Sequence, residues 1–333
     1  MLVGMTARRF PLLGVLALTV SLALAGCGGD DEGGGEDGGD DAAAEAPARS
    51  PLTGLPVKGE PRHPVLAVKI DNSSSSAPQL GLGDAGMVVE ELVEGGITRL
   101  AVFFYNDVPA DVGPVRSMRA TDIGIVSPLG AALVASGGAP PTVERVKDAD
   151  IKTFTEGARG YYRATSRSAP YNLFMRLDEL ARKVKSTETP QPYLPFEEGA
   201  ELPKGKPATG LTASFSAGSS TTFELRGRSY VNTDSNAAEG DRFDPATVLV
   251  LRVPVGDAGY LDPAGNPVPE TKFTGRGKAF IFHGGRVVQG DWVKGGLGAP
   301  VELQVGGDEV TLPPGKVWLE LVPQDGGDVT WTR

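Results

Sequence analysis

The single cysteine is the residue that most constrains how this chain can fold. Cys27 is the only cysteine among 333 residues, so no intramolecular disulfide can hold the fold together. It follows a basic segment with Arg8 and Arg9 and an apolar run over residues 10–25, the order of an export signal. The run is shorter than the roughly 20 residues that a membrane-spanning helix needs. We therefore expect the chain to fold outside the cytoplasm, around cores large enough to need no covalent staple.

The four residues that end this run, Leu24-Ala25-Gly26-Cys27, resemble the lipobox of bacterial lipoproteins. The resemblance implies that residues 1–26 are a signal peptide and that Cys27 carries lipid, with acyl chains such as palmitate. Two acyl chains anchor a protein stably, so the membrane is an expected partner and the outer face of the cytoplasmic membrane the expected location. The open alternative is an ordinary secretory signal that a cysteine follows by chance.

The segment after Cys27 concentrates the negative charge of the chain. The whole chain has a net charge of −10, and residues 28–50 hold eight acidic residues against one arginine, Arg49, among many glycines and alanines. Such a composition cannot bury enough apolar surface to fold. We therefore expect residues 27–50 to form a disordered, acidic, glycine-rich tether that its like charges extend. The acidic balance also argues against a nucleic-acid partner.

The first folded part, residues 51–195, has the pattern of an α/β domain. Short apolar runs alternate with segments of helical spacing, and a run that is apolar on both faces belongs in the middle of a sheet. We therefore expect a mixed, largely buried sheet with helices packed against it. The predicted strands are 65–70, 87–94, 97–105 and 131–135, and the predicted helices are 115–126 and 173–184.

The second folded part, residues 213–333, follows a linker that we place at residues 196–212. Its apolar runs are short and are separated by Gly, Pro and Asp at short intervals. This pattern is typical of strands joined by turns. The sequence therefore predicts an α/β N-terminal domain followed by a mainly β C-terminal domain.

The segment Gly113-Pro114-Val115-Arg116-Ser117-Met118-Arg119 is the most unusual in the chain. If a helix begins at residue 115, Arg116 and Arg119 share one face of it. The N-terminus of a helix ordinarily prefers acidic residues, whereas backbone N–H groups and two guanidinium groups together would bind an anion. Two alternatives stay open: the arginines pair with Glu90, Glu91, Glu94 or Asp122, and Ser117 is a nucleophile or a helix cap.

Polar residues also follow two predicted strands. Asp71 and Asn72 end one strand, and Ser136 follows another. If the two strands run parallel, these residues lie at one edge of the sheet, where α/β proteins bind ligands. Glu90 and Glu91 alternate faces, so at most one of them points to a given site. These carboxylates are candidate acid–base groups, or else members of a structural hydrogen-bonded network.

The sequence gives little support to histidine-, nucleotide- or metal-dependent chemistry. The chain holds only two histidines, His63 and His283, each next to a strand or turn, and no nucleotide-binding, zinc-protease or nucleophile-elbow motif. The acidic loop 234–244 departs from the spacing of an EF-hand. We therefore predict no metal ion and no cofactor.

Several motifs are spread over the folded part of the chain: Pro51-Leu52-Thr53-Gly54, Ile70-Asp71-Asn72, the segment 94–99, Gly113-Pro114-Val115-Arg116-Ser117, the segment 169–173, Trp292, and Pro314-Gly315-Lys316-Val317-Trp318. Together they resemble the YerB-like lipoprotein family, a two-domain family without an assigned reaction. The resemblance extends from residue 51 to nearly the end of the chain. It implies a histidine where this chain has Tyr171, so the imidazole is missing here.

The leading hypothesis is a surface-tethered envelope lipoprotein that binds an anionic ligand, such as a glycan, a peptide carboxylate or a phosphate. One alternative is a hydrolase or transferase that acts on envelope polymers, with Asp71 or Glu91 as acid–base and arginines stabilising charge. Another is a structural partner in an envelope complex, in which case the polar residues would be paired internally. The candidate ligand-binding residues are Asp71, Asn72, Glu91, Glu94, Arg99, Arg116, Ser117, Arg119 and Asn172.

Overall fold

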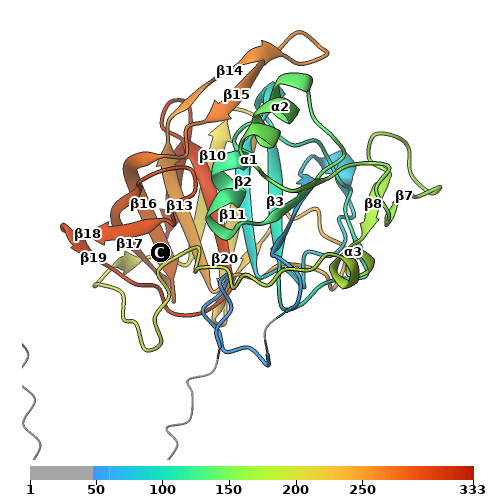
Figure 1. Cartoon of the computed structure of the whole chain (residues 1–333). Coiled ribbons are helices and arrows are strands. Elements are labelled where there is room, and N and C mark those ends of the chain that lie inside the picture. The colour runs from blue at the N-terminus through green and yellow to red at the C-terminus, as the bar shows by residue number, and fades with distance from the viewer. Residues whose placement is uncertain (1–47, 60) are drawn as a thin grey trace, which may run out of the picture. The chain divides into compact units, whose positions relative to one another are not determined.

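The computed structural model describes residues 48–59 and 61–333 (Figure 1). The predicted signal peptide, Cys27 and nearly all of the predicted tether lie outside these residues. Within the described part of the chain, no helix is both long enough and apolar enough to cross a membrane.

The main sheet of the protein has 12 strands and joins the two folded parts. In the N-terminal part, β1 pairs with β3 in antiparallel fashion and with β5 in parallel, and β3 pairs with β2. The N-terminal strands of this sheet are β1 (Leu66–Asp71), β2 (Met87–Leu92), β3 (Thr98–Phe104), β5 (Ala132–Val134) and β6 (Thr153–Phe154).

The C-terminal part adds the other strands of this sheet, and β20 lies in parallel between β13 and β2. The pairing of β2 with β20 therefore makes one continuous sheet out of both parts. The strands added are β9 (Lys206–Pro207), β13 (Thr247–Val253), β16 (Gly275–His283), β17 (Arg286–Lys294), β18 (Glu302–Val305), β19 (Asp308–Glu309) and β20 (Val317–Pro323).

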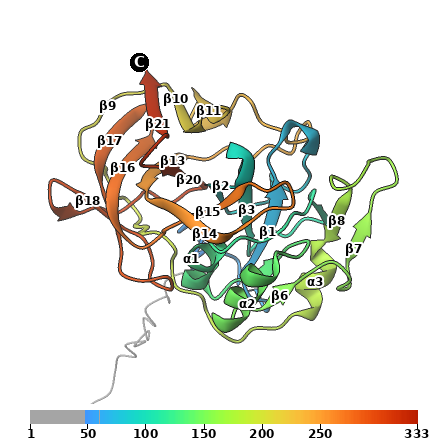
Figure 2. The same ribbon diagram turned by 90° about the horizontal axis from the view of Figure 1, so that it is seen from above.

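Smaller elements cover both faces of this sheet. Figure 2 shows α1 and α2 on one side and the sheet that contains β10, β11 and β21 on the other. The helices are α1 (Asp122–Val126), α2 (Pro140–Asp148) and α3 (Leu177–Lys183), with 3-10 turns at Ser74–Ser76, Glu94–Gly96 and Ser127–Leu129. The remaining strands are β4 (Asp111–Val112), β7 (Tyr161–Arg163), β8 (Leu173–Arg176), β10 (Gly210–Ser216), β11 (Ser219–Arg226), β12 (Ser229–Asn232), β14 (Val255–Leu261), β15 (Pro267–Thr271) and β21 (Asp328–Thr332).

Each face of the main sheet has its own hydrophobic core, because side chains alternate along a strand. On β20, Leu319 packs into the core beneath α1, whereas Trp318 packs into the core beneath β10 and β11. The Trp318 ring lies 5.3 Å from the ring of Phe223, centroid to centroid, in an edge-on contact. Burial on both faces explains why the strands of this sheet read as continuous apolar runs.

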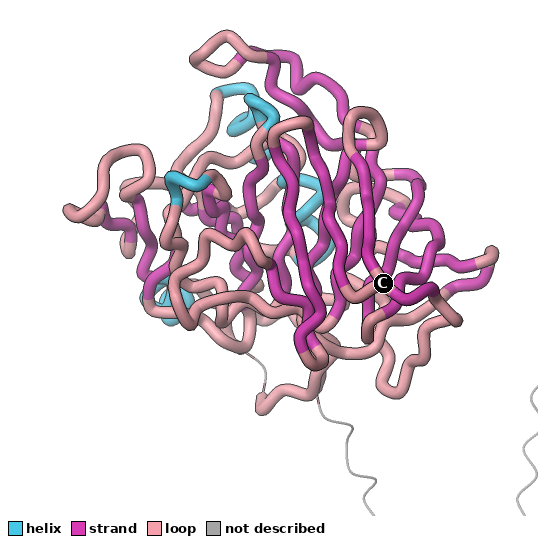
Figure 3. Tube along the Cα trace, turned by 180° about the vertical axis from the view of Figure 1, so that it is seen from behind, coloured by secondary structure: helices cyan, strands magenta, loops and turns pink. Residues whose placement is uncertain are grey.

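The predicted fold class is confirmed. The structure has many strands and few helices (Figure 3), and its C-terminal part is mainly strands. The predictions of helices at residues 115–126 and 173–184 are wrong for the first half of each segment. Residues 114–118 are extended and α1 begins only at Asp122, while residues 173–176 form β8 and α3 begins at Leu177. In both cases, backbone groups pair with strands distant in sequence, and these contacts override the local helical spacing.

Candidate functional site at the carboxyl end of β1 and β5

β1 and β5 are parallel neighbours, which is the condition under which Asp71 and Ser136 lie at one edge of the sheet, and the two strands separate at that edge. β1 and β5 pair only as far as Val68 and Val134. Beyond this point residues 114–118 enter between them: the Arg116 N–H donates to Lys69 O at 2.9 Å, and the Ser136 N–H donates to Arg116 O at 3.0 Å. The unusual motif thus fills the crevice in which α/β proteins commonly bind ligands.

Gly113 makes this insertion possible. Its φ of +147° is a conformation that L side chains rarely adopt, and a Cβ there would lie 2.9 Å from Phe174 Cδ1 and 3.0 Å from Leu173 O. The Val115 N–H then donates to Leu173 O at 2.7 Å. The chain is therefore fixed on both sides where it delivers Arg116 to the edge of the sheet.

Arg116 has a more exposed side chain than the neighbouring Arg99 and Arg119, with 23% of it accessible to solvent. Its Nε lies 2.8 Å from Oδ2 of the buried Asp71, and its guanidinium carbon lies 5.5 Å from the centre of the Tyr171 ring. Asp71 Oδ1 is occupied by the Ser73 N–H at 2.8 Å. Within the described residues, no hydrogen bond involves the two terminal nitrogens of Arg116. These two nitrogens of the guanidinium group therefore remain available to an acceptor on a ligand.

Arg119 and Arg99 are instead committed to protein groups. Arg119 donates from Nε to Glu94 Oε2 at 2.7 Å and from Nη2 to Glu94 Oε1. Arg99 is buried and donates to Ser117 O at 2.8 Å. Burial, followed by the charge of Arg119, lowers the pKa of Arg99 to about 10. Although burial opposes it, the pairing with Arg119 and Arg99 lowers the pKa of Glu94. For Arg119, the alternative of pairing with nearby carboxylates is therefore confirmed.

A second ionic group lies deeper on the same face of the sheet. Lys69 Nζ lies 2.5 Å from Glu91 Oε1 and 2.7 Å from Asp122 Oδ1, and all three side chains are fully buried. Asp122 Oδ2 also accepts the Arg119 N–H at 2.7 Å. Burial raises the pKa of Glu91. Glu91 is therefore buried too deeply to contact a ligand. Its role is to stabilise the sheet beneath the edge where Arg116 lies.

The opposite face holds a buried pair of acids, one of which the sequence analysis did not single out. Glu90 and Glu320 are register partners on β2 and β20. Glu90 accepts hydrogen bonds from Asn72 Nδ2 at 3.0 Å and from Thr221 Oγ at 2.9 Å. Both Glu320 oxygens are buried without a hydrogen-bond donor in the described residues. A glutamate inside the apolar run Val317-Trp318-Leu319-Glu320-Leu321-Val322 is the signal that marks this position.

The candidate residues therefore divide into groups. Asn72 donates to Glu90 on the opposite face of the sheet, and Asn172 accepts from Arg163 at the surface. Neither forms a hydrogen bond with Arg116 in the described residues. Tyr171, not Asn172, lies beside Arg116. The residues that gather at the edge are Asp71, Glu94, Arg99, Arg116, Ser117 and Arg119, together with Ser136, whose Oγ lies 3.3 Å from Ser117 Oγ.

None of five cavities in the described part of the chain is lined by these residues. Nor do the described residues include a group of three or more His, Cys, Asp or Glu side chains that could hold a metal ion. The Arg116 side chain lies partly exposed at this edge, outside those cavities. Such a position suits one anionic group of a larger ligand more than a small enclosed molecule.

Comparison with known proteins decides the family. Residues 52–190 match the N-terminal domain of a protein family of unknown function, DUF3048, and residues 213–319 match its C-terminal domain. The chain belongs to the DUF3048 family. The predicted resemblance to YerB is confirmed, since this DUF3048 chain is 25% identical over 295 residues to the Bacillus subtilis (strain 168) protein named "Putative lipoprotein YerB", covering 83% of this chain and 86% of that one.

A solved structure shows the same fold. The crystal structure of the YerB protein from Bacillus subtilis matches this DUF3048 chain with a TM-score of 0.71 at 21% sequence identity. The match covers 85% of this chain and 99% of that one. The continuous two-part architecture is therefore shared with YerB.

Proposed function

We propose that this DUF3048 chain is an envelope lipoprotein, held by lipid on Cys27 at the outer face of the cytoplasmic membrane, that binds an anionic envelope ligand at Arg116. The export signal with its lipobox and the similarity to a protein named as a lipoprotein support the anchor. The acidic segment that follows Cys27 would keep the folded part away from anionic lipid.

Replacing Cys27 with alanine should release the protein from the membrane fraction, because the lipid is the only anchor that we propose. Fractionation of cells that express wild type or Cys27→Ala, with labelling by a fatty acid, checks this. Ser50→Ala is a matched control that should leave both readouts unchanged. Continued labelling and membrane recovery of the Cys27 variant would contradict the anchor.

One observation supports an anionic ligand: the guanidinium of Arg116 lies against Asp71 and Tyr171, its side chain is 23% exposed, and no hydrogen bond from the described residues occupies its terminal nitrogens. A planar fork of this kind recognises carboxylate and phosphate groups through two parallel hydrogen bonds. The hydroxyl groups of Ser117 and Ser136, adjoining in the crevice, supply further donors. The ligand class is therefore a phosphate or carboxylate on an envelope glycan or peptide.

Titration with inorganic phosphate, glycerol phosphate oligomers and a muramyl peptide tests the proposal. Arg116→Ala is expected to weaken binding of the preferred probe at least tenfold, and Arg116→Lys to restore only part of it, because lysine lacks the fork. Arg182→Ala, an exposed arginine that pairs with Asp178 on α3, is the matched control. Equal affinity of wild type and Arg116→Ala for every probe would refute the anion site.

A second candidate, a structural partner in an envelope complex, is favoured by the internal pairing of Arg119, Glu94 and Glu91. In that case Arg116→Ala would lower stability without changing any ligand affinity. The thermal unfolding of each variant, measured beside its titration, separates the two functions.

A further inference from the structure

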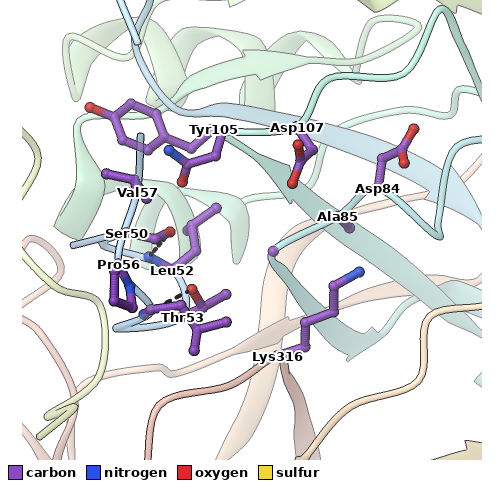
Figure 4. A pocket seen from close by; sticks show the side chains of 13 residues that line it. Ser50, Leu52, Thr53, Pro56, Val57, Asp84, Ala85, Tyr105, Asp107 and Lys316 are labelled. Atoms are coloured by element: carbon purple, nitrogen blue, oxygen red, sulfur yellow. Dashed lines mark hydrogen bonds between the residues drawn. The ribbon is translucent and has the colours of Figure 1, made fainter. Parts of the chain in front are cut away.

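A cavity at the opposite edge of the main sheet is not used by the proposed anion site. It lies where β2 and β20 begin, at Met87 and Val317, and where β3 ends, just before Tyr105. Figure 4 shows this cavity with Lys316 below, Asp84 and Asp107 above it, and the segment around Leu52 along one side. Its volume is about 160 Å³.

The wall of the cavity is made by two motifs that lie at opposite ends of the folded chain. Leu52 of Pro51-Leu52-Thr53-Gly54 is buried, and the Gly315 N–H of the Pro314–Trp318 motif donates to Thr53 O at 2.8 Å. The Tyr193 N–H donates to Pro51 O at 3.0 Å. These backbone bonds fix the segment 50–57 against the start of β20. Neither motif contributes to the crevice around Arg116.

Lys316 places a half-buried ammonium group in this wall. Its Nζ donates to Gly83 O at 2.5 Å and lies 5.3 Å from the centre of the Phe243 ring. It forms no salt bridge with a carboxylate of the described residues. An ammonium has three donors, so this one keeps donors for an acceptor in the cavity. Burial lowers the pKa of Lys316, and the charges of Asp84, Asp107 and Asp244 oppose this.

The rest of the lining is divided by polarity. Two exposed carboxylates, Asp84 and Asp107, stand at the end where Lys316 lies, and no hydrogen bond to either side chain is made by the described residues. Leu52, Pro56 and Val57 line the other side. A ligand that fits must carry a positive and a negative group close together, joined to a short apolar body.

The volume limits the size of that body. A protein cavity of about 150 Å³ is known to bind benzene, so a cavity of about 160 Å³ admits a ligand of about six non-hydrogen atoms, the size of alanine. A second cavity of about 520 Å³ adjoins it and shares the lining residues Pro56, Val57, Asn106 and Asp107.

We propose that the cavity at Lys316 binds a free α-amino acid with a small apolar side chain. The carboxylate of the ligand accepts from Lys316 Nζ, its ammonium group lies between the carboxylates of Asp84 and Asp107, and its side chain packs against Leu52 and Val57. The site is separate from Arg116, so a failure here leaves the proposed function standing.

Isothermal titration of the folded chain with alanine, valine, N-acetylalanine, alaninamide and alanylalanine tests this proposal. Alanine or valine is expected to bind saturably, and the two blocked forms, which lack one charge each, at least tenfold more weakly. Absence of saturable binding by both free amino acids would overturn the proposal. So would binding of alanylalanine without binding of either free amino acid, since it would assign the cavity to peptide ends.

Three variants connect the binding to the cavity. Lys316→Met is expected to weaken binding at least tenfold, and Val57→Trp, which fills the cavity without removing a charge, to abolish it. Lys278→Met, an exposed lysine paired with Asp291, should bind as wild type does. If Lys316→Met does not fold, as judged by circular dichroism, Val57→Trp decides alone. Unchanged binding by folded Val57→Trp would contradict the assignment.

Discussion

Replacing Lys69 with methionine is expected to lower the free energy of unfolding by about 3–5 kcal/mol. The substitution leaves the carboxylates of Glu91 and Asp122 together in a site from which water is excluded. A buried charge without its partner costs far more than an exposed one. Methionine fills nearly the same volume as lysine, so the loss measures the missing charge more than a cavity.

Urea denaturation, followed by circular dichroism, measures this effect. Lys278→Met, which removes an exposed salt bridge, is the matched control and should change the free energy of unfolding by less than about 1 kcal/mol. The double variant Lys69→Met with Glu91→Gln should recover part of the loss, because it removes one of the two carboxylates that were left unpaired. A loss for Lys69→Met no larger than that of the control would show that the ionic group does not hold the sheet to α1.

Replacing Glu320 with glutamine should make the protein more stable at alkaline pH and remove part of its pH dependence. Glu320 is fully buried beside Glu90, and burial, then the neighbouring carboxylate, raises its pKa well above the usual 4.5. Burial likewise raises the pKa of Glu90, although hydrogen bonds from Thr98 and Thr221 oppose this. Glutamine keeps the shape of the side chain and donates to Glu90 as the protonated acid would.

The direction of the effect follows from the raised pKa. A carboxyl group that holds its proton more tightly in the folded state stabilises that state fully below about pH 4.5, and the stabilisation is lost as the pH rises through the folded-state pKa. Glutamine does not titrate, so the variant should be more stable than wild type near pH 8 and equally stable in mild acid. Urea denaturation over this pH range checks it, with Glu309→Gln on the exposed strand β19 as control. Parallel curves for wild type and Glu320→Gln would contradict the raised pKa of Glu320.

The sequence predicts the framework of the site because that framework is local. The apolar run before Asp71 predicts β1, and the run before Ser136 predicts β5. Alternation along β2 correctly predicts that Glu90 and Glu91 face opposite ways: one accepts from Thr221 and the other contacts Lys69. These features depend on residue type and a two-residue period, both of which are visible without a partner strand.

The parts that the sequence does not predict depend on distant pairing. Residues 114–118 have apolar spacing compatible with a helix, yet their N–H and C=O groups pair with Lys69, Asp71 and Ser136. The helix N-terminus proposed for Arg116 and Arg119 is therefore wrong, and the arginines face different partners. The pairing of Glu90 with Glu320 likewise requires β20 to lie beside β2, which no local pattern reveals.

The most direct test of the proposed function follows the arginine side chains themselves. In protein labelled with ¹⁵N, the Nε–H resonances of Arg116, Arg99, Arg119 and Arg182, assigned by substitution, are recorded while glycerol phosphate oligomers or a muramyl peptide is added. A saturable shift of the Arg116 resonance is expected, with those of Arg99 and Arg119 nearly unchanged because the Arg99 guanidinium is buried and donates from Nη1 to Ser117 O, and Arg119 Nε donates to Glu94. An Arg116 resonance that stays still, or moves no more than that of the surface residue Arg182, would contradict the anion site.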